Sequence, residues 1–381
     1  MTYLPDMEVI KSCLFERVLG ELSAFSPESF SLSDVRAALE KDWLDAYDFG
    51  ALLSFAADGC LEDIAVRARV ETARYFGNTI RLYTPLYIAN YCGNQCTYCA
   101  FSSRNDIKRG KLSMDEINRE LDAIAKTGVD DVLILTGEAR EVSGVEYIGH
   151  AVKAATERFG SVGIEIYPLN TDEYAYIHQC GADFVSIYQE TYDTDIYDKI
   201  HPKGPKRCFP YRFHSQERAV MGGMRGVSFG VLLGLGDAGR DAYAAGLHAY
   251  YLQKKYPHIE ISLSVPRLRA FNTSSALDTE TIAATGASER RLLQIMLAYR
   301  LFLPYAGIAI STRERESFRN NVLGLCATKM SAGVNVGVGG YDIDQKGGEQ
   351  FIISDSRSVE EIHKSIFAKG MQPVYTDHIR V

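Results

Sequence analysis

Three cysteines close together in the chain are the residues whose types and spacing most directly indicate chemistry. They are spaced Cys92-x3-Cys96-x2-Cys99, and the eight histidines all lie at or beyond His150. A structural zinc site closes with four protein ligands, usually two pairs of Cys or His, and no second pair with that spacing is present. A [4Fe–4S] cube suits three soft thiolates, because it leaves one iron open to a ligand that is not protein.

Other interpretations of the three cysteines remain open. Buried structural thiols need no particular spacing, and a cytosolic redox pair would need only C-x-x-C. A non-catalytic iron–sulfur protein that passes electrons would complete four cysteine ligands per cluster, whereas this motif stops at three. The spacing therefore favours a cluster with an open position over these alternatives.

The cysteine motif resembles that of the radical S-adenosylmethionine enzymes, whose signature is C-x3-C-x2-C with an aromatic residue before the last cysteine. Tyr98 occupies that aromatic position. The resemblance implies a [4Fe–4S] cluster on Cys92, Cys96 and Cys99, with S-adenosyl-L-methionine on the open iron. One electron from the cluster would split the sulfonium and give a 5′-deoxyadenosyl radical, so the chain is expected to be an enzyme.

A short polar motif follows the second predicted strand. It reads Thr136-Gly137-Glu138, and a glycine between polar residues at a strand end is usually only a turn. The family carries a G-G-E-like motif at this position that holds the ammonium of the cofactor; here Thr136 replaces the first glycine. By the same resemblance, Glu165 and Arg212 are expected to contact the ribose and the carboxylate of S-adenosylmethionine.

Later motifs resemble the aromatic amino acid lyase branch of the family, and within it the tyrosine lyases that make 2-iminoacetate (dehydroglycine) for thiamine thiazole biosynthesis. These motifs lie at residues 76–79, 85–87, 188–192, 265–269 and 311–314, and the similarity extends from about residue 60 to 375. The resemblance implies that a hydrogen atom is taken from the amino group of L-tyrosine. Scission of the Cα–Cβ bond then yields 2-iminoacetate and p-cresol.

Three further residues are expected at the amino and carboxylate end of the substrate. Arg313 at a strand end suits the carboxylate, because a guanidinium binds it bidentately; the alternative is a salt bridge with Glu314 or Glu316 at the barrel rim. The resemblance places Tyr87 and Ser331 nearby. Tyr87, one of 23 tyrosines, could instead fill the barrel interior.

Two related enzymes are the nearest alternatives. A tryptophan lyase would share the cluster and carboxylate motifs. A tyrosine-cleaving [FeFe]-hydrogenase maturase would add a second cysteine-ligated cluster, but the only cysteine after Cys208 is Cys326. Ala100 follows the last motif cysteine where a glycine is common, and the tail lacks the Trp-Lys-Asp-Trp-like ending of the tyrosine lyases. These departures concern contacts with partners, for which a reducing flavodoxin or ferredoxin and a thiazole synthase are the candidates.

Composition favours small-molecule ligands. The chain has 381 residues with 46% hydrophobic and 24% charged content, and a net charge of −8 from 41 basic and 49 acidic residues. No dense run of Lys or Arg indicates a nucleic-acid backbone partner. No signal peptide or membrane span is recognised, and the scattered cysteines outside the motif do not form a disulfide framework, so a reducing cytoplasm is expected.

The residues that could do chemistry must be positioned by alternating strands and helices. Apolar residues recur at helical spacing over residues 1–75, which predicts an N-terminal helical extension. Buried strands are predicted at 80–88, 132–135, 164–167, 184–187, 227–233, 259–265 and 308–311. Capping boxes at Ser113–Glu116 and Ser358–Glu361 start helices, and Gly181 ends one.

Repeated strand–helix units imply a parallel sheet, and about seven or eight of them predict an α/β fold of the (β/α) TIM-barrel type, full or nearly full. The predicted barrel with its C-terminal segment spans residues 76–375. Its site should lie on the loops at the C-terminal ends of the strands. The Gly-rich stretch 333–340 does not match G-x-G-x-x-G and is expected to be a loop near the site.

Overall fold

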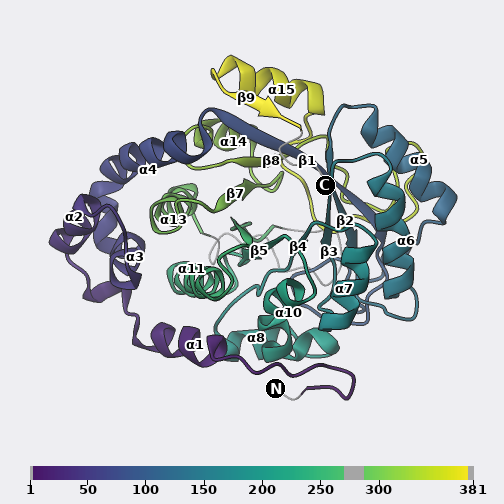
Figure 1. The fold of residues 1–381 in the computed structure, drawn as a ribbon, viewed down its shortest axis with the longest axis horizontal. Coiled ribbons are helices and arrows are strands. Elements are labelled where there is room, and N and C mark those ends of the chain that lie inside the picture. The colour runs from purple at the N-terminus through teal and green to yellow at the C-terminus, as the bar shows by residue number, and fades with distance from the viewer. Residues whose placement is uncertain (1–2, 270–286, 376–381) are drawn as a thin grey trace.

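The computed structural model describes residues 3–269 and 287–375 of the chain, and its centre is a closed parallel barrel (Figure 1). The barrel strands are β1 Thr79–Ala89, β2 Asp131–Thr136, β3 Ser161–Glu165, β4 Phe184–Ser186, β5 Gly226–Gly230, β6 Glu260–Ser264, β7 Gly307–Ile310 and β8 Lys329–Ser331. Each pairs in parallel with the next, and β1 pairs with both β2 and β8, which closes the ring. The predicted TIM-type barrel is therefore confirmed and complete.

A ninth strand lies outside the ring. β9, Gln372–Val374, pairs in parallel with the first residues of β1, Thr79–Arg81. It extends the sheet at the end of the barrel where β1 begins. The cysteine loop follows the opposite end of β1. The end of the barrel where the strands begin is called the floor below, and the end where they finish is called the mouth.

Helices surround the barrel on all sides in Figure 1. They are α5 Met114–Ala125, α6 Val145–Thr156, α7 Thr171–Gln179, α8 Thr194–Ile200, α9 Phe209–Phe213, α10 Ser215–Met221, α11 Ala238–Lys255, α13 Glu289–Phe302, α14 Glu316–Val322 and α15 Val359–Ala368. The capping boxes predicted at Ser113 and Ser358 are formed, and each satisfies two backbone N–H groups at a helix start. Gly181, at φ 106°, follows the end of α7 as predicted.

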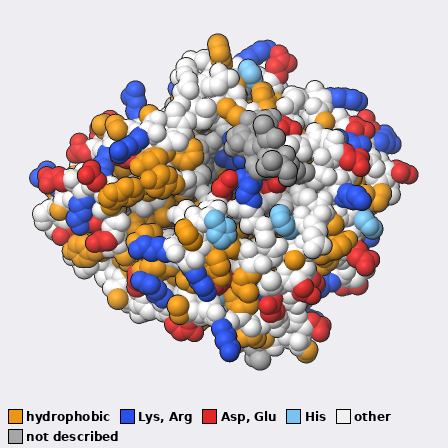
Figure 2. Space-filling model, in the orientation of Figure 1, with side chains coloured by type: hydrophobic (Ala, Val, Ile, Leu, Met, Phe, Trp, Pro, Cys, Tyr) orange, Lys and Arg blue, Asp and Glu red, His pale blue; other side chains and the backbone are white. Residues whose placement is uncertain are grey.

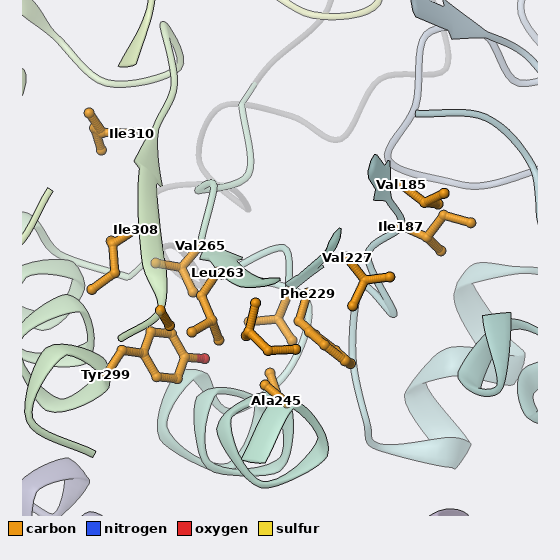
Figure 3. Close-up of a cluster of buried hydrophobic side chains, with 14 of the residues drawn as sticks. Val185, Ile187, Val227, Phe229, Ala245, Leu263, Val265, Tyr299, Ile308 and Ile310 are labelled. Carbon is orange, nitrogen blue, oxygen red and sulfur yellow. The ribbon is translucent and has the colours of Figure 1, made fainter. Parts of the chain in front are cut away.

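The layer between the strands and helices α11 and α13 is apolar. In Figure 3, Val227, Phe229 and Leu263 of the strands lie against Ala245 of α11, with Tyr299 of α13 beside them. All five side chains are nearly inaccessible to solvent. The Tyr299 hydroxyl donates a hydrogen bond to the Ala242 carbonyl at 3.0 Å, so its one polar group is satisfied inside the core.

The N-terminal residues form helices α1 Leu14–Ala24, α2 Leu32–Glu40, α3 Ala46–Leu53 and α4 Leu61–Phe76, with short 3₁₀ turns between them. They cover the outer side of α11 and α13 (Figure 1). The Phe49 ring stacks on Phe302 at 4.3 Å, and the Gln294 amide donates to the Leu52 and Ser54 carbonyls at 2.9 and 3.0 Å. The helical extension is thus packed on the barrel by both apolar and polar contacts.

The surface carries mixed charges. Figure 2 shows acidic and basic side chains interspersed, with hydrophobic side chains gathered over the N-terminal helices. Exposed apolar residues in those helices include Tyr47, Val66 and Val70. Among the helices of the described residues, none is long and apolar enough to cross a membrane.

The strand boundaries differ from the predictions where buried chain continues beyond a strand. The predicted β3 included Ile166 and Tyr167, which are buried but follow the last sheet residue. Likewise β5 ends at Gly230, although Val231 to Leu233 remain buried and make only isolated bridges. The three-residue strands β8 and β9 were not predicted, because Lys329–Ser331 and Gln372–Val374, unlike the equally short β4, are not part of a longer apolar run.

Candidate active site

Two adjoining cavities open at the mouth of the barrel, and together they contain every site residue predicted from the sequence. The cysteine-side cavity, of about 110 Å³, is lined by Cys92, Cys96, Thr136, Gly137, Glu138 and Arg212 among others. The arginine-side cavity, of about 130 Å³, is lined by Tyr98, Arg313 and Ser331 among others. Residues lining both are Tyr87, Cys99, Leu135, Glu165, Glu190, Lys206 and Gln350. The two groups of predicted residues therefore face one continuous region.

The loop that carries the cysteines has little secondary structure, and Arg109 holds it in place. Its guanidinium donates to the carbonyls of Asn90, Phe101 and Ser102 at 2.8 Å each, and to that of Asn105 at 3.2 Å. These bonds satisfy carbonyls that lack partners in a helix or sheet. This role could not be predicted from the sequence, because an arginine ten residues after the motif is not distinctive.

The three cysteines are free thiols, and burial disfavours ionisation of Cys96 and Cys99. Burial raises the pKa of Cys96 to about 12 and also raises that of Cys99, while the Lys206 ammonium opposes both shifts. The positive charge of a bound metal centre would stabilise the thiolate form of these sulfurs. Within the described ranges, no three His, Cys, Asp or Glu side chains converge on one point as ligands of a single ion would. The set fits a cube better than one zinc ion, because each cysteine of a cube binds its own iron.

Tyr98, the aromatic residue of the motif, is fixed by His201. The His201 Nδ1 lies 2.8 Å from the Tyr197 carbonyl, which can only accept, so Nδ1 carries the hydrogen. Nε2 therefore accepts from the Tyr98 hydroxyl at 2.7 Å. Burial, with the charges of Lys206 and Arg212, lowers the pKa of His201 to about 2, which keeps this ring neutral. Tyr98 thus has one defined orientation between Cys96 and the arginine-side cavity.

The Thr136-Gly137-Glu138 motif forms a cradle beside the cysteine loop. A Cβ on Gly137 would lie 2.3 Å from the Tyr91 carbonyl oxygen, so only glycine fits. The Thr136 hydroxyl is buried and has no hydrogen-bond partner among the described residues. Burial raises the pKa of Glu138, opposed by a hydrogen bond from Asn94 and by the charge of Arg212. An orphaned hydroxyl and a buried carboxyl facing the same cavity fit a ligand that donates hydrogen bonds.

Glu190 is the most strained residue of the site. Its φ of 73° is the only positive value at a non-glycine position among the residues described. Lys206 and Arg212 lie 2.7 and 3.5 Å from its carboxylate. Burial would raise the pKa of Glu190, but these two cations outweigh it and hold the pKa below its ordinary value. The sequence singled out Arg212 but neither of its partners, because the three residues meet only through the fold.

Glu165 ends β3 and is shared by both cavities. Burial raises its pKa to about 7, and the nearby charge of Glu190 adds to the shift, while Ser186 and Arg313 oppose it. This carboxyl therefore changes its ionisation near neutral pH, unlike Glu190. It occupies the strand end at which the sequence predicted a cofactor contact.

Arg313 follows β7 and faces the arginine-side cavity with its charge unpaired. Its guanidinium carbon lies 3.6 Å from the centre of the Phe351 ring, a cation–π contact. No carboxylate of the described residues lies within salt-bridge distance of it. Glu314 is held instead by Arg267 and Arg269, and Glu316 by Arg357. The rim salt bridge considered for Arg313 is therefore not formed.

Tyr87 and Ser331 line the same cavity as Arg313. The Tyr87 hydroxyl donates to Gln350 Oε1 at 2.7 Å, and Gln350 Nε2 lies 3.9 Å from the Cys99 sulfur. Ser331 ends β8, and its buried hydroxyl has no hydrogen-bond partner among the described residues. Gln350 was not predicted as a site residue, because it is 251 positions from Cys99 in the chain.

Comparisons with known proteins agree with this geometry. Residues 86–240 match the Radical SAM superfamily, and residues 264–372 match the Biotin and Thiamin Synthesis associated domain. The 2-iminoacetate synthase of Escherichia coli (strain K12) is 38% identical over 346 residues, which cover 91% of this chain and 90% of that enzyme.

Two solved structures of the [FeFe]-hydrogenase maturase HydG share the fold. One has a TM-score of 0.87 and 28% identity, covering 96% of this chain and 81% of that chain. The other, from Carboxydothermus hydrogenoformans, has a TM-score of 0.83 and 28% identity, covering 95% and 83%. With its cluster motif, its complete barrel and this extent of identity, the chain belongs to the 2-iminoacetate synthase family of the radical SAM superfamily.

Proposed function

We propose that this protein is a radical S-adenosylmethionine lyase that cleaves the Cα–Cβ bond of L-tyrosine into 2-iminoacetate and p-cresol, for thiamine thiazole biosynthesis. The observation that carries the proposal is the half-buried Arg313 guanidinium, which has no carboxylate partner among the described residues and faces the same space as Cys99. An unpaired cation that is partly removed from water is costly, so a site that keeps one is suited to an anion. The α-carboxylate of an amino acid meets that need.

The cysteine-side cavity is the proposed place of the cofactors. Cys92, Cys96 and Cys99 would hold a [4Fe–4S] cluster, and the Thr136–Glu138 cradle with Arg212 would hold S-adenosyl-L-methionine. When bound, these cofactors would supply one electron and a 5′-deoxyadenosyl radical able to take a hydrogen atom from the substrate. The Thr136 hydroxyl and the Glu138 carboxyl are suited to accept hydrogen bonds from an ammonium group.

Glu165 is proposed to face the ribose of S-adenosylmethionine. It lines both cavities, and a carboxylate can accept hydrogen bonds from two neighbouring hydroxyls. Its position at the junction keeps the cofactor next to the substrate. That proximity matters because a radical must meet its target before water or other groups do.

The arginine-side cavity is the proposed place of tyrosine. Arg313 can bind the carboxylate through two parallel N–H···O bonds, and the Phe351 ring beneath it fixes the plane of the guanidinium. The Tyr87 hydrogen is committed to Gln350, so the Tyr87 oxygen presents its lone pairs to the amino group. Both ends of the amino acid backbone are thereby oriented.

The rest of that cavity offers apolar surface to an aromatic side chain. Its apolar and aromatic lining residues are Tyr83, Pro85, Leu133, Tyr188, Leu232, Pro266, Val334 and Val336. Ser264, Ser311 and Thr312 line it as well, so it also offers polar groups to a substrate. An electron donor such as a reduced flavodoxin or ferredoxin, and a thiazole synthase that accepts the product, are the proposed partners.

Product analysis tests the proposal. The protein is reconstituted anaerobically with iron and sulfide and incubated with S-adenosylmethionine, dithionite and either tyrosine, tryptophan or phenylalanine. We expect both a large amount of 5′-deoxyadenosine and the formation of p-cresol with tyrosine, and neither of these with tryptophan or phenylalanine. An indole product from tryptophan would instead assign the chain to the tryptophan lyases, and absence of 5′-deoxyadenosine with all three would end the lyase assignment.

A further inference from the structure

A segment after β8 crosses the mouth of the barrel and joins the two halves of the site. This strap, residues 334–355, is anchored on the cysteine side by the Gly348 N–H, which donates to the Lys108 carbonyl at 2.8 Å. At its other end the Ser354 N–H donates to the Thr312 carbonyl at 2.8 Å, next to Arg313. The strap is therefore fixed to both the cluster loop and the end of β7.

A buried carboxylate holds the middle of the strap. Glu120 of α5 accepts from three successive N–H groups, those of Tyr341, Asp342 and Ile343, each at 2.9 Å. Val338 forms a parallel bridge with Tyr87 of β1. These contacts leave little freedom to the residues that the strap places over the cavities.

Two adjacent strap residues enter the site with different tasks. Phe351 lies under the Arg313 guanidinium. Gln350 contacts both Cys99 and Tyr87, with its nitrogen 3.9 Å from the Cys99 sulfur and its oxygen 2.7 Å from the Tyr87 hydroxyl. A single side chain thus spans from a cluster cysteine to the residue proposed to face the substrate amine.

The polarity of these two contacts follows from chemistry. A metal-bound thiolate can only accept hydrogen bonds, so the amide must turn its N–H toward Cys99. The amide oxygen then faces Tyr87, which must donate its hydroxyl hydrogen to it. The lone pairs of the Tyr87 oxygen are left for the substrate, where an N–H donor is expected. The reversed amide would place oxygen against an anionic sulfur.

We propose that Gln350 is a positioning residue that couples the cluster to the substrate amine, by donating to the Cys99 sulfur and by orienting the Tyr87 hydroxyl. The inference rests on the proposed function and deepens it. A hydrogen bond to a cluster sulfur stabilises the reduced state, so Gln350 raises the reduction potential. Through Tyr87 it also strengthens tyrosine binding.

Three variants and one control separate the two effects. Gln350→Met keeps the length of the side chain and loses the hydrogen bonds to both Cys99 and Tyr87. Tyr87→Phe loses only the hydrogen bond between Tyr87 and Gln350, and the double variant completes a double-mutant cycle. Gln345→Met is the matched control, because Gln345 lies on the same strap, donates to the Gly347 carbonyl at 2.9 Å and lines neither cavity.

The first measurement is the midpoint potential of the reconstituted cluster, monitored by EPR in the absence of substrate. Iron content checks that the cluster is loaded, and thermal melting checks that the variant is folded. We expect Gln350→Met to shift the potential negative by about a tenfold change in the ratio of reduced to oxidised cluster, which is 59 mV for a one-electron couple. Tyr87→Phe and Gln345→Met should match the parent. A parent-like potential in Gln350→Met, with full iron content, would overturn the proposal.

The second measurement is the KM for tyrosine. Gln350→Met and Tyr87→Phe should each raise KM roughly fivefold, as expected for one lost hydrogen bond. The double variant should show the KM of Tyr87→Phe and the potential of Gln350→Met. If the two effects on KM multiply instead, Gln350 does not act through Tyr87 and the coupling is wrong. If the parent protein makes no p-cresol, the proposed function is refuted. The midpoint potentials would still test whether Gln350 donates a hydrogen bond to Cys99.

Discussion

The mouth and the floor of the barrel both contain cavities lined by charged residues, but they treat those charges differently. The floor cavity, of about 420 Å³, is the larger, and its cations are paired. The buried Asp131 carboxylate lies 2.8 Å from Arg81 and 2.9 Å from Lys329, and Arg225 pairs with Glu260. At the mouth, Arg313 has no carboxylate partner among the residues described.

This difference shows that the pairing of charges, rather than the size of a cavity, locates the site. Charges at the floor neutralise one another and stabilise the closed ring of strands. At the mouth, Lys206 and Arg212 pair with Glu190, whereas the Arg313 guanidinium remains available to a ligand at some cost to stability. Variants at the mouth should therefore change catalysis, and variants at the floor should change stability.

Removal of a cluster ligand at the mouth should have the largest effect. Cys99→Ala leaves two of the three thiolates, so we expect loss of most bound iron and turnover below about one-thousandth of the parent. Cys13→Ala, at the exposed start of α1, is the matched control and should behave as the parent. Iron analysis and 5′-deoxyadenosine formation measure both. Retention of cluster and turnover in Cys99→Ala would refute the assignment of the motif.

Loss of the free guanidinium should come next. Arg313→Met removes the proposed partner of the substrate carboxylate, so kcat/KM for tyrosine should fall by about 10² to 10³, mostly through KM. The floor offers a matched cation: Arg225→Met should leave kcat/KM within about twofold of the parent. Steady-state kinetics of p-cresol formation give both values. Equal losses in the two variants would remove the distinction between the mouth and the floor.

At the floor, Asp131→Asn should lower stability without changing catalysis. It leaves Arg81 and Lys329 without their shared carboxylate, and their side chains keep only 14% and 17% exposure. We expect the free energy of unfolding to fall by about 2 kcal/mol, with KM for tyrosine unchanged. Urea unfolding and steady-state kinetics test this. A raised KM with parent stability would mean that the floor takes part in binding.

Glu165→Gln should, besides any effect on catalysis, change the stability in a way that depends on pH. Because the folded pKa of about 7 lies above the ordinary value, the folded protein holds this proton more tightly than the unfolded chain. The cost of the buried carboxylate grows as pH rises from about 4 to 7 and is complete above pH 7. The variant should therefore be more stable by about 3 kcal/mol at pH 8 and equal to the parent at pH 4. Urea unfolding at the two pH values measures this; a variant less stable at pH 8 would contradict the burial argument.

The sequence predicts best what depends on neighbours in the chain. The cysteine spacing, the capping box at Ser113 and the alternation of strands and helices are local patterns, and each is found in the structure. The strand ends that carry Glu165 and Arg313 could be placed because parallel strands bring their C-terminal ends to one side. Membership of the family then supplied roles for these residues as predictions.

Residues that act through long-range contacts could not be predicted in this way. Gln350 meets Tyr87 from 263 positions away, on a strap without regular secondary structure. Lys206 was not identified, and Glu190 appeared only within the motif at 188–192 without a site role, because their ion pair depends on how the loops after β4 and α8 fold against each other. Arg109 supports the cluster loop only through backbone carbonyls, which leave no mark in a side-chain pattern.

One measurement tests most directly whether the mouth of the barrel performs the proposed reaction on an exchangeable hydrogen of tyrosine rather than on a carbon-bound one. The reaction is run in D2O, where the amino and phenol hydrogens of tyrosine exchange with solvent and its carbon-bound hydrogens do not, and the products are analysed by mass spectrometry. We predict p-cresol together with 5′-deoxyadenosine that has gained one deuterium. Formation of 5′-deoxyadenosine without deuterium, or without p-cresol, would contradict the proposed lyase.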